Sequence, residues 1–296
     1  MIPAVSQICT LHAPLEKDVE DYAAGHVGAI ELWLGKVEGW LAARKPQELK
    51  DLLAQHELTV PAASFQGGLL ISQGDARREH WNHFERRLAL LAELGVGTLV
   101  IAGDIHGPLD QQALDRVNMS LAQAAQKAQA SGVRLALEFQ AGATLANNLQ
   151  TAAALVEQVG SPNLGLCFDV YHYYVGPSKE EDLGLLGPHN LFHVQFSDVI
   201  GVPREMASDG DRVLPGDGDF RLDSIVARLR RHRLPRRRVD RNDEPSALAN
   251  SPATIWRNRR HGAAESAGNG ERRLRKRRGA SDEWRVRRGC CAPLRI

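Results

Sequence analysis

Residues 133–139 (VRLALEF), 164–172 (LGLCFDVYH) and 191–198 (LFHVQFSD) decide the fold class of this chain. Each segment is a short run of apolar residues that ends in polar side chains. Runs of this length that are apolar on both faces are typical of strands buried in a parallel sheet. These segments therefore predict three neighbouring strands whose last residues carry the chemistry.

The remainder of the N-terminal part repeats the same alternation of strand and helix. Gly95, Gly132 and Gly160 follow helical patterns, where a left-handed cap suits glycine. A further helix-like segment covers 222–230. The other predicted strands are 4–11 (AVSQICTL), 29–34 (AIELWL), 59–65 (TVPAASF) and 98–103 (TLVIAG), and the predicted helices include 47–56, 81–94, 112–131 and 145–159.

Seven βα units in about 230 residues favour a doubly wound sheet or a (β/α)8 barrel. No glycine-rich phosphate loop follows the first strand, which argues against the nucleotide-binding version of the doubly wound sheet. A barrel requires eight strands, and the eighth is missing from its expected place. We therefore predict an α/β fold, a (β/α)8 TIM barrel with seven recognisable units in residues 1–229.

Residues 230–296 have a different character from residues 1–229. They hold 20 of the 37 Lys and Arg residues but 7 of the 36 Asp and Glu residues, so their net charge is +13 against −12 before them. Arginine makes up 19 of these 67 residues, and no apolar periodicity is visible. One interpretation is a disordered basic tail. The other is the product of a shifted reading frame, and in both cases we expect an unstructured second region.

Composition sets the expected location and partners of the protein. The first residues lack the basic start and long apolar stretch expected of a signal peptide, and no apolar run approaches the length that a membrane span needs. Its four cysteines show neither zinc spacing nor disulfide density, which indicates a reduced, cytoplasmic protein. The acidic part gives no reason to expect nucleic-acid binding. The basic tail makes such binding an alternative, but it lacks interleaved aromatic residues beyond Trp256 and Trp284.

The ends of the last three predicted strands carry the candidate functional residues. Glu138 ends the fifth, Asp169 the sixth, and Gln195 lies in the seventh, with His172 following Asp169 and His193 facing the same way as Gln195. In barrels these ends converge on one pocket. Two carboxylates with an amide or imidazole suit Mg²⁺, Mn²⁺, Co²⁺ or Zn²⁺. The alternatives are a helix cap or ion pair for each acid, backbone contacts for Gln195 and a core role for His172.

A long loop, 197–220, follows the seventh strand and is rich in proline, glycine and acids. Long loops at the catalytic face of a barrel usually carry function. Arg204 is a candidate for holding a substrate hydroxyl, carboxylate or phosphate, and its alternative is a surface arginine. The stretch 214–220 either shapes the rim of the pocket or forms a simple turn. His12, after the first strand, is a further candidate substrate contact.

The stretches 136-ALEF, 166-LCFDVYH, 193-HVQFSD and 212-RVLPGDGDF resemble the sugar phosphate isomerase/epimerase family with the xylose-isomerase-like barrel. The resemblance covers roughly residues 1–229. It implies Glu138, Asp169 and Gln195 as ligands of a divalent metal and His172 as a substrate contact. Gln at the third ligand position resembles the hydroxypyruvate-isomerase-like branch. Apurinic endonucleases share the barrel but use more histidine ligands than His12 and His106 would supply.

The resemblance implies an enzyme acting on a small keto-sugar or related polyhydroxy carbonyl compound through an enediolate. Two glutamates exchange the proton in epimerases of this family, one being Glu138 here. A dehydratase acting on an inosose or dehydroshikimate is the alternative within the same barrel. The substrate itself, isomerase against epimerase, and the metal stay open. Many members form dimers or tetramers, so a homo-oligomer fits the resemblance.

The family expects a second glutamate at the end of an eighth strand, and this chain offers 231-RHRLPRRRVDRNDEPSALANSP instead. With suitable codons, a one-base shift across Arg237–Pro245 would encode Ala-Ala-Ser-Ile-Glu-Met-Met-Asn-Pro, a plausible strand ending in a carboxylate. We therefore hypothesise a frameshift near residue 230, and we expect its loss of the glutamate to impair activity. Resequencing codons 225–245 tests the hypothesis, because an intact reading frame would refute it.

Overall fold

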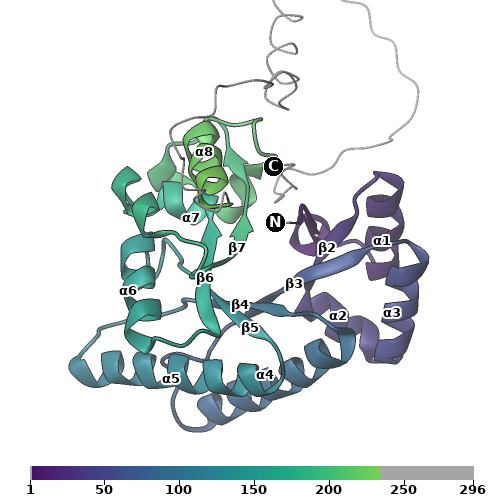
Figure 1. Ribbon diagram of the computed structural model, residues 1–296, viewed down its shortest axis with the longest axis horizontal. Coiled ribbons are helices and arrows are strands. Elements are labelled where there is room, and N and C mark those ends of the chain that lie inside the picture. The colour runs from purple at the N-terminus through teal and green to yellow at the C-terminus, as the bar shows by residue number, and fades with distance from the viewer. Residues whose placement is uncertain (1, 234–296) are drawn as a thin grey trace, which may run out of the picture. The chain divides into compact units, whose positions relative to one another are not determined.

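The computed structural model describes residues 2–233, in which seven strands form one parallel sheet in the order of the sequence (Figure 1). This arrangement confirms the predicted run of seven parallel βα units of a TIM barrel. Two further short strands form a separate antiparallel pair. The strands of the parallel sheet are β1 (Val5–Ser6), β2 (Ala29–Trp33), β3 (Thr59–Gln66), β4 (Thr98–Ala102), β5 (Arg134–Glu138), β6 (Leu164–Asp169) and β7 (Leu191–Gln195), and the separate pair is β8 (Asp198–Val199) and β9 (Arg212–Val213).

Helices connect successive strands and lie around the outside of the sheet (Figure 1). Within the described part of the chain, no helix combines the length and apolar character needed to cross a membrane. The helices are α1 (Leu15–Ala24), α2 (Leu34–Leu41), α3 (Pro46–Gln55), α4 (Gly74–Leu94), α5 (Gln111–Ala130), α6 (Leu149–Val159), α7 (Val170–Val175) and α8 (Leu222–Arg233). Short 3-10 turns are η1 (Gln7–Thr10), η2 (Glu180–Leu185), η3 (Arg204–Met206) and η4 (Asp209–Asp211).

Local sequence signals explain several helix ends. Asp110 caps α5 by accepting the Ala113 N–H at 2.8 Å, and Asn148 caps α6 by accepting the Thr151 N–H at 2.9 Å. The three glycines predicted after helices all adopt positive φ angles, at 75° for residue 95, 70° for residue 132 and 64° for residue 160. The predicted left-handed glycine turns are therefore confirmed.

In two of the predicted strands, a helical turn takes up part of the apolar run. In the run 4–11 only Val5–Ser6 is a strand, and Gln7–Thr10 forms η1. The run 164–172 leaves the sheet at Asp169, whose carboxylate caps α7 and turns the next residues into a helix. Helix α4 begins seven residues before the predicted start at Trp81. The apolar pattern missed its first two turns because they carry few apolar residues.

Apolar side chains pack on both faces of the sheet. Strands β4, β5 and β6 are almost wholly buried. One layer, between the sheet and the helices, is large and includes Phe84 and Phe139. On β4, β5 and β6, Val100, Ala136 and Cys167 form a second small cluster that packs against Phe192. These two layers make the strands rigid supports for the side chains at their ends.

The predicted boundary between residues 229 and 230 falls inside α8, which continues to Arg233. The boundary and the unstructured tail stay predictions, because residues 234–296 lie outside the described residues. The same holds for the frameshift hypothesis and for the alternative of nucleic-acid binding through the tail.

Candidate metal centre

Three adjacent parallel strands bring the predicted metal ligands to one end of the sheet. Glu138 is the last residue of β5, Asp169 of β6 and Gln195 of β7, and Asp169 pairs in register with Gln195. All three side chains are buried. One candidate ligand atom from each of Glu138, Asp169 and His172 lies within 4.8 Å of the others. The structure thus brings His172 into the same cluster as the two predicted carboxylate ligands.

His172 lies in the first turn of α7, three residues after Asp169. Its Nδ1 accepts the Ala141 N–H at 3.4 Å, which leaves Nε2 for another partner. Burial lowers the pKa of His172, although the Asp169 carboxylate acts in the opposite direction. The imidazole is therefore neutral at neutral pH, the form that suits both a metal ligand and a hydrogen-bonding substrate contact.

Asp169 is held in its charged form by its neighbours. Its Oδ1 accepts the N–H groups of Tyr171 at 2.7 Å and His172 at 3.2 Å, and its Oδ2 accepts Arg212 Nη1 at 2.9 Å. Burial alone would raise the pKa of Asp169, but the Arg212 guanidinium and the helix-end N–H groups lower it below its usual value. Asp169 thus caps a helix and forms an ion pair, the two alternatives predicted for it, and it also lies in the cluster with Glu138 and His172.

Glu138 behaves in the opposite way. Burial, and next the negative charge of Asp169, raise the pKa of Glu138 to about 8. A divalent cation between these carboxylates would offset both the desolvation and the mutual repulsion. The donor set of two carboxylates, one neutral imidazole and one amide therefore fits a divalent metal.

Glu31, in the middle of β2, was not recognised from the sequence. It is buried, its Oε1 accepts Gln195 Nε2 at 2.9 Å and the Ser64 hydroxyl, and its Oε2 lies 2.8 Å from His193 Nε2. Despite burial, His193 and these hydrogen bonds lower the pKa of Glu31. Because Gln195 donates its N–H to Glu31, its amide oxygen Oε1 is the atom left for a metal.

Arg212, the first residue of the stretch 212-RVLPGDGDF, is a further functional candidate that the sequence pattern did not predict. It lies in β9 (Arg212–Val213), which pairs antiparallel with β8 (Asp198–Val199). Its guanidinium stacks over the Tyr171 ring at 4.0 Å and also donates to Asp209. The Arg212 side chain, which comes from the loop between β7 and α8, therefore holds the Asp169 carboxylate in place.

Two predicted substrate contacts lie outside this cluster. Arg204, in η3, is exposed and pairs with Glu205 at 3.6 Å. His12 is exposed in the turn after η1. Neither residue is among the three whose candidate ligand atoms come together in residues 2–233, so their roles stay predictions.

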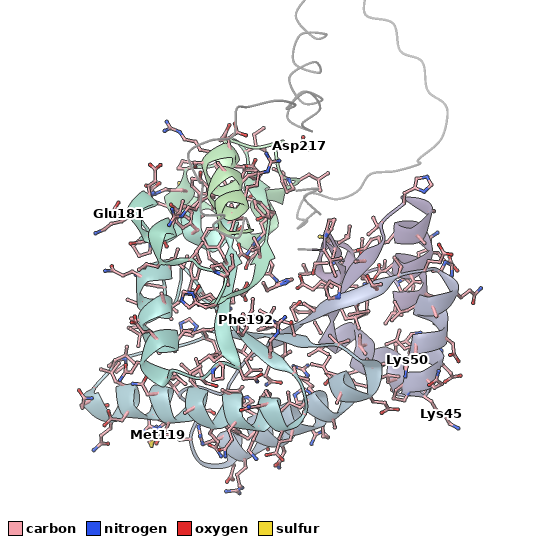
Figure 2. All side chains as sticks on the ribbon, viewed as in Figure 1. Lys45, Lys50, Met119, Glu181, Phe192 and Asp217 are labelled. Atoms are coloured by element: carbon pink, nitrogen blue, oxygen red, sulfur yellow. The ribbon has the colours of Figure 1, made fainter. Side chains whose placement is uncertain are left out.

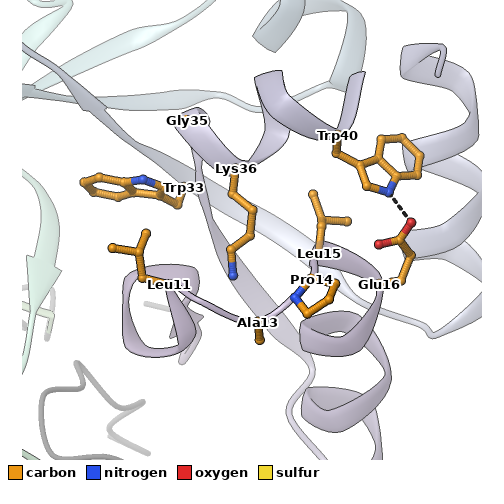
Figure 3. A pocket seen from close by; sticks show the side chains of 9 residues that line it. All are labelled: Leu11, Ala13, Pro14, Leu15, Glu16, Trp33, Gly35, Lys36 and Trp40. Carbon is orange, nitrogen blue, oxygen red and sulfur yellow. Dashed lines mark hydrogen bonds between the residues drawn. The ribbon is translucent and has the colours of Figure 1, made fainter. Parts of the chain in front are cut away.

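A recess of about 430 Å³ lies where β1 and β2 end (Figure 3). Trp33, Leu11 and Trp40 line it, and the Lys36 side chain extends between them. Lys36 Nζ donates to the buried Asp18 carboxylate and, at 2.8 Å, to the Thr10 carbonyl. This ion pair ties α1, α2 and η1 together beside the strand that carries Glu31.

Lys36→Met is expected to lower the free energy of unfolding by roughly 3 kcal/mol, because it leaves Asp18 buried without its counter-ion. Urea unfolding followed by circular dichroism at pH 7 measures the change. Lys50→Met, on an exposed lysine labelled in Figure 2, is the matched control and should change little. The double variant Asp18→Asn/Lys36→Met should recover part of the loss, and an equal loss in both variants would contradict the ion-pair explanation.

Metal affinity is expected to rise with pH. Since the pKa of Glu138 is about 8, a metal must displace a proton from this carboxyl at lower pH. The association constant should therefore increase about tenfold per pH unit from about pH 6 to about pH 8, and level off above it. Calorimetric titration with Mn²⁺ across this range measures the slope. An affinity independent of pH would mean that Glu138 is already ionised or is not a ligand.

The chain belongs to the xylose isomerase-like TIM barrel family, whose model matches residues 22–237. An inosose isomerase of Halalkalibacterium halodurans is 33% identical over 100 residues, which are 33% of this chain and 36% of that protein. A 3-dehydroshikimate dehydratase of Pseudomonas aeruginosa is 24% identical over 229 residues, 74% of this chain and 34% of that protein. Both matches thus span about a third of the relative's length.

Solved structures show the same fold. The crystal structure of an IolI protein with a bound zinc atom superposes with a TM-score of 0.72 at 22% identity, covering 78% of this chain and 84% of that one. A D-tagatose 3-epimerase-like protein gives a TM-score of 0.64 at 20% identity, with 78% and 86% coverage. The chain is thus similar to isomerases, epimerases and dehydratases that share one barrel.

Proposed function

We propose that this protein is a metal-dependent isomerase or epimerase of a keto-sugar or related small polyhydroxy carbonyl compound. The observation that carries the proposal is the pair of buried carboxylates on adjacent strands, with the pKa of Glu138 raised to about 8. A divalent metal beside these carboxylates would lower that pKa and leave Glu138 ionised, which is the form that a general base needs. Zinc in a structure of the same fold supports a divalent metal but does not choose one.

Glu138, Asp169 and Gln195, with His172 beside them, would hold the metal. A divalent metal bound there would polarise a substrate carbonyl and stabilise negative charge on its oxygen. Glu138 would take the proton from the carbon next to that carbonyl. His172, neutral because burial lowers its pKa, would hydrogen-bond a neighbouring hydroxyl. Arg212 would keep Asp169 ionised and oriented.

We also propose that turnover by this chain is impaired. The family's second glutamate would return the proton on the opposite face of the substrate. The segment of this chain that should supply it lies within residues 234–296, and its sequence does not match the expected pattern ending in glutamate. Removal of one general acid or base costs about 10²–10⁴ in rate. The half-reaction that needs Glu138 alone, exchange of the substrate proton with solvent, should persist.

Exchange with heavy water tests the proposal. The protein with Mn²⁺ is incubated in D₂O with a panel of ketohexoses, ketopentoses and inososes, and deuterium next to the carbonyl is followed by proton NMR. Metal-dependent exchange with at least one compound is expected. No exchange with any of them, by a protein that binds the metal, would contradict the isomerase or epimerase proposal.

A dehydratase is the second candidate, because the Pseudomonas relative matches 74% of this chain. It would use Glu138 to remove the same kind of proton but would then expel water. Absorbance of a conjugated product from dehydroshikimate distinguishes this outcome from exchange on neutral keto-sugars.

A further inference from the structure

The loop between β7 and α8 is folded around the carboxylate of Asp198. This side chain is fully buried. Its Oδ1 accepts the N–H groups of Val199 and Phe220, each at 2.9 Å, and its Oδ2 accepts the Gly216 N–H at 3.1 Å. One carboxylate thus joins the first residues of the loop to its last residues, and backbone N–H groups satisfy its charge.

The close approach at Gly218 shows how tightly the loop encloses this carboxylate. A Cβ atom at residue 218 would collide with Asp198 Oδ1 and with the Val199 carbonyl oxygen. Any larger side chain there would have to push the loop backbone away from Asp198.

The same loop carries Arg212 to the metal centre. In the β8–β9 pair, Asp198 lies opposite Val213 and Val199 opposite Arg212. Arg212 is largely buried and reaches Asp169 Oδ2 at 2.9 Å and the Ser197 hydroxyl at 3.3 Å. Asp198 therefore fixes the backbone on both sides of the residue that orients a candidate metal ligand.

We propose that Asp198 is a positioning residue, which controls metal affinity by keeping the loop in the conformation that holds Arg212 on Asp169. Groups that orient a ligand typically change metal affinity by about 10–100-fold when they are removed. The Asp198 carboxylate accepts hydrogen bonds from backbone N–H groups of its own loop, so we expect it to act through Arg212. The proposal rests on the proposed metal centre but on no particular substrate.

The test is a double-mutant cycle on the full-length chain with Co²⁺ as the probe, followed by its visible absorption. Asp198→Asn places an amide N–H₂ among backbone N–H donors and should weaken Co²⁺ binding by about tenfold. Arg212→Gln should weaken it to a similar degree. If Asp198 acts through Arg212, the double variant should bind Co²⁺ as Arg212→Gln does. Additive losses in the double variant would overturn the proposal.

Asp217→Asn is the matched control, since Asp217 is an exposed aspartate of the same loop (Figure 2). It should bind Co²⁺ within about twofold of the unaltered chain. Cleavage after the exposed Glu205 by a glutamyl endopeptidase gives a second readout, and it should accelerate in Asp198→Asn but not in the control. Equal Co²⁺ affinity in Asp198→Asn and the control would overturn the proposal.

If Asp198→Asn does not fold, Gly218→Ala decides, because it displaces the same carboxylate without removing its charge. It should also weaken Co²⁺ binding, and an unchanged affinity would overturn the proposal. Failure of the unaltered chain to bind Co²⁺ would instead refute the metal centre. The two failures are therefore distinguishable.

Discussion

Glu138→Gln is expected to slow deuterium exchange next to the substrate carbonyl by about 10²–10⁴-fold. Glutamine keeps the shape of the side chain but cannot accept the proton. The measurement is made at saturating Mn²⁺, because the substitution also removes a candidate ligand. The metal-free protein should not be destabilised, since the carboxyl is protonated below about pH 8 and glutamine resembles that form.

The pH dependence of stability gives this variant a second signature. Because the native pKa of Glu138 is raised from 4.5 to about 8, the native state keeps a proton that the unfolded chain releases. Stability from this group is therefore present below about pH 4.5 and is lost as the pH rises to about 8. Glu138→Gln should reduce that loss, while exposed Glu157→Gln should change neither exchange nor stability. Normal exchange in Glu138→Gln would exclude Glu138 as the base.

Asp169→Asn is expected to weaken binding of a divalent metal by more than about 100-fold, beyond the range for groups that only orient a ligand. Asparagine can still cap α7 through its carbonyl oxygen, so the local helix should survive. The variant removes the negative charge that lies between Arg212 and the metal position. It should also lower the pKa of Glu138, because the negative charge of Asp169 is, after burial, the next largest cause of its elevation.

Calorimetric titration with Mn²⁺ measures the affinity, and Asp209→Asn is the control. Asp209 also accepts Arg212, at 2.8 Å, but its side chain is 78% exposed. The control should therefore bind the metal within about threefold of the unaltered chain. Comparable losses in both variants would mean that Asp169 acts by holding Arg212 rather than as a ligand.

The strand-end acids could be predicted because their positions follow from short-range pattern. Glu138 and Asp169 each end an apolar run, and parallel strands place such residues side by side. Glu31 could not be found this way, because its partners Gln195 and His193 lie 164 and 162 residues away in sequence. The only signal in the sequence was a single acidic residue inside the apolar run 29-AIELWL. One residue forms no periodic pattern, so the run alone did not show that Glu31 has a special role.

Two other features depended on competing local effects. Residues 170–172 continue the apolar run of β6, so the pattern favoured a longer strand, whereas the Asp169 carboxylate starts a helix there. Arg212 reaches Asp169 only after the loop closes around Asp198 and places β9 beside β8. Side-chain hydrogen bonds to backbone N–H groups determine both the helix after Asp169 and the position of Arg212. Hydrophobic periodicity does not predict such bonds.

The bonds from Glu31 to Gln195 and His193 also bear on the order in which the molecule is assembled. They join the second strand to the seventh, so their sequence separation is among the longest in the described chain. Contacts between residues so far apart in sequence carry the largest loop-closure entropy cost, so we expect them to form late in folding. During synthesis on the ribosome, the first six strands can emerge and pack before Gln195 has been added to the chain. The amide that completes the centre is therefore oriented only when β7 docks, and a nascent chain should acquire high affinity for metal in this last step.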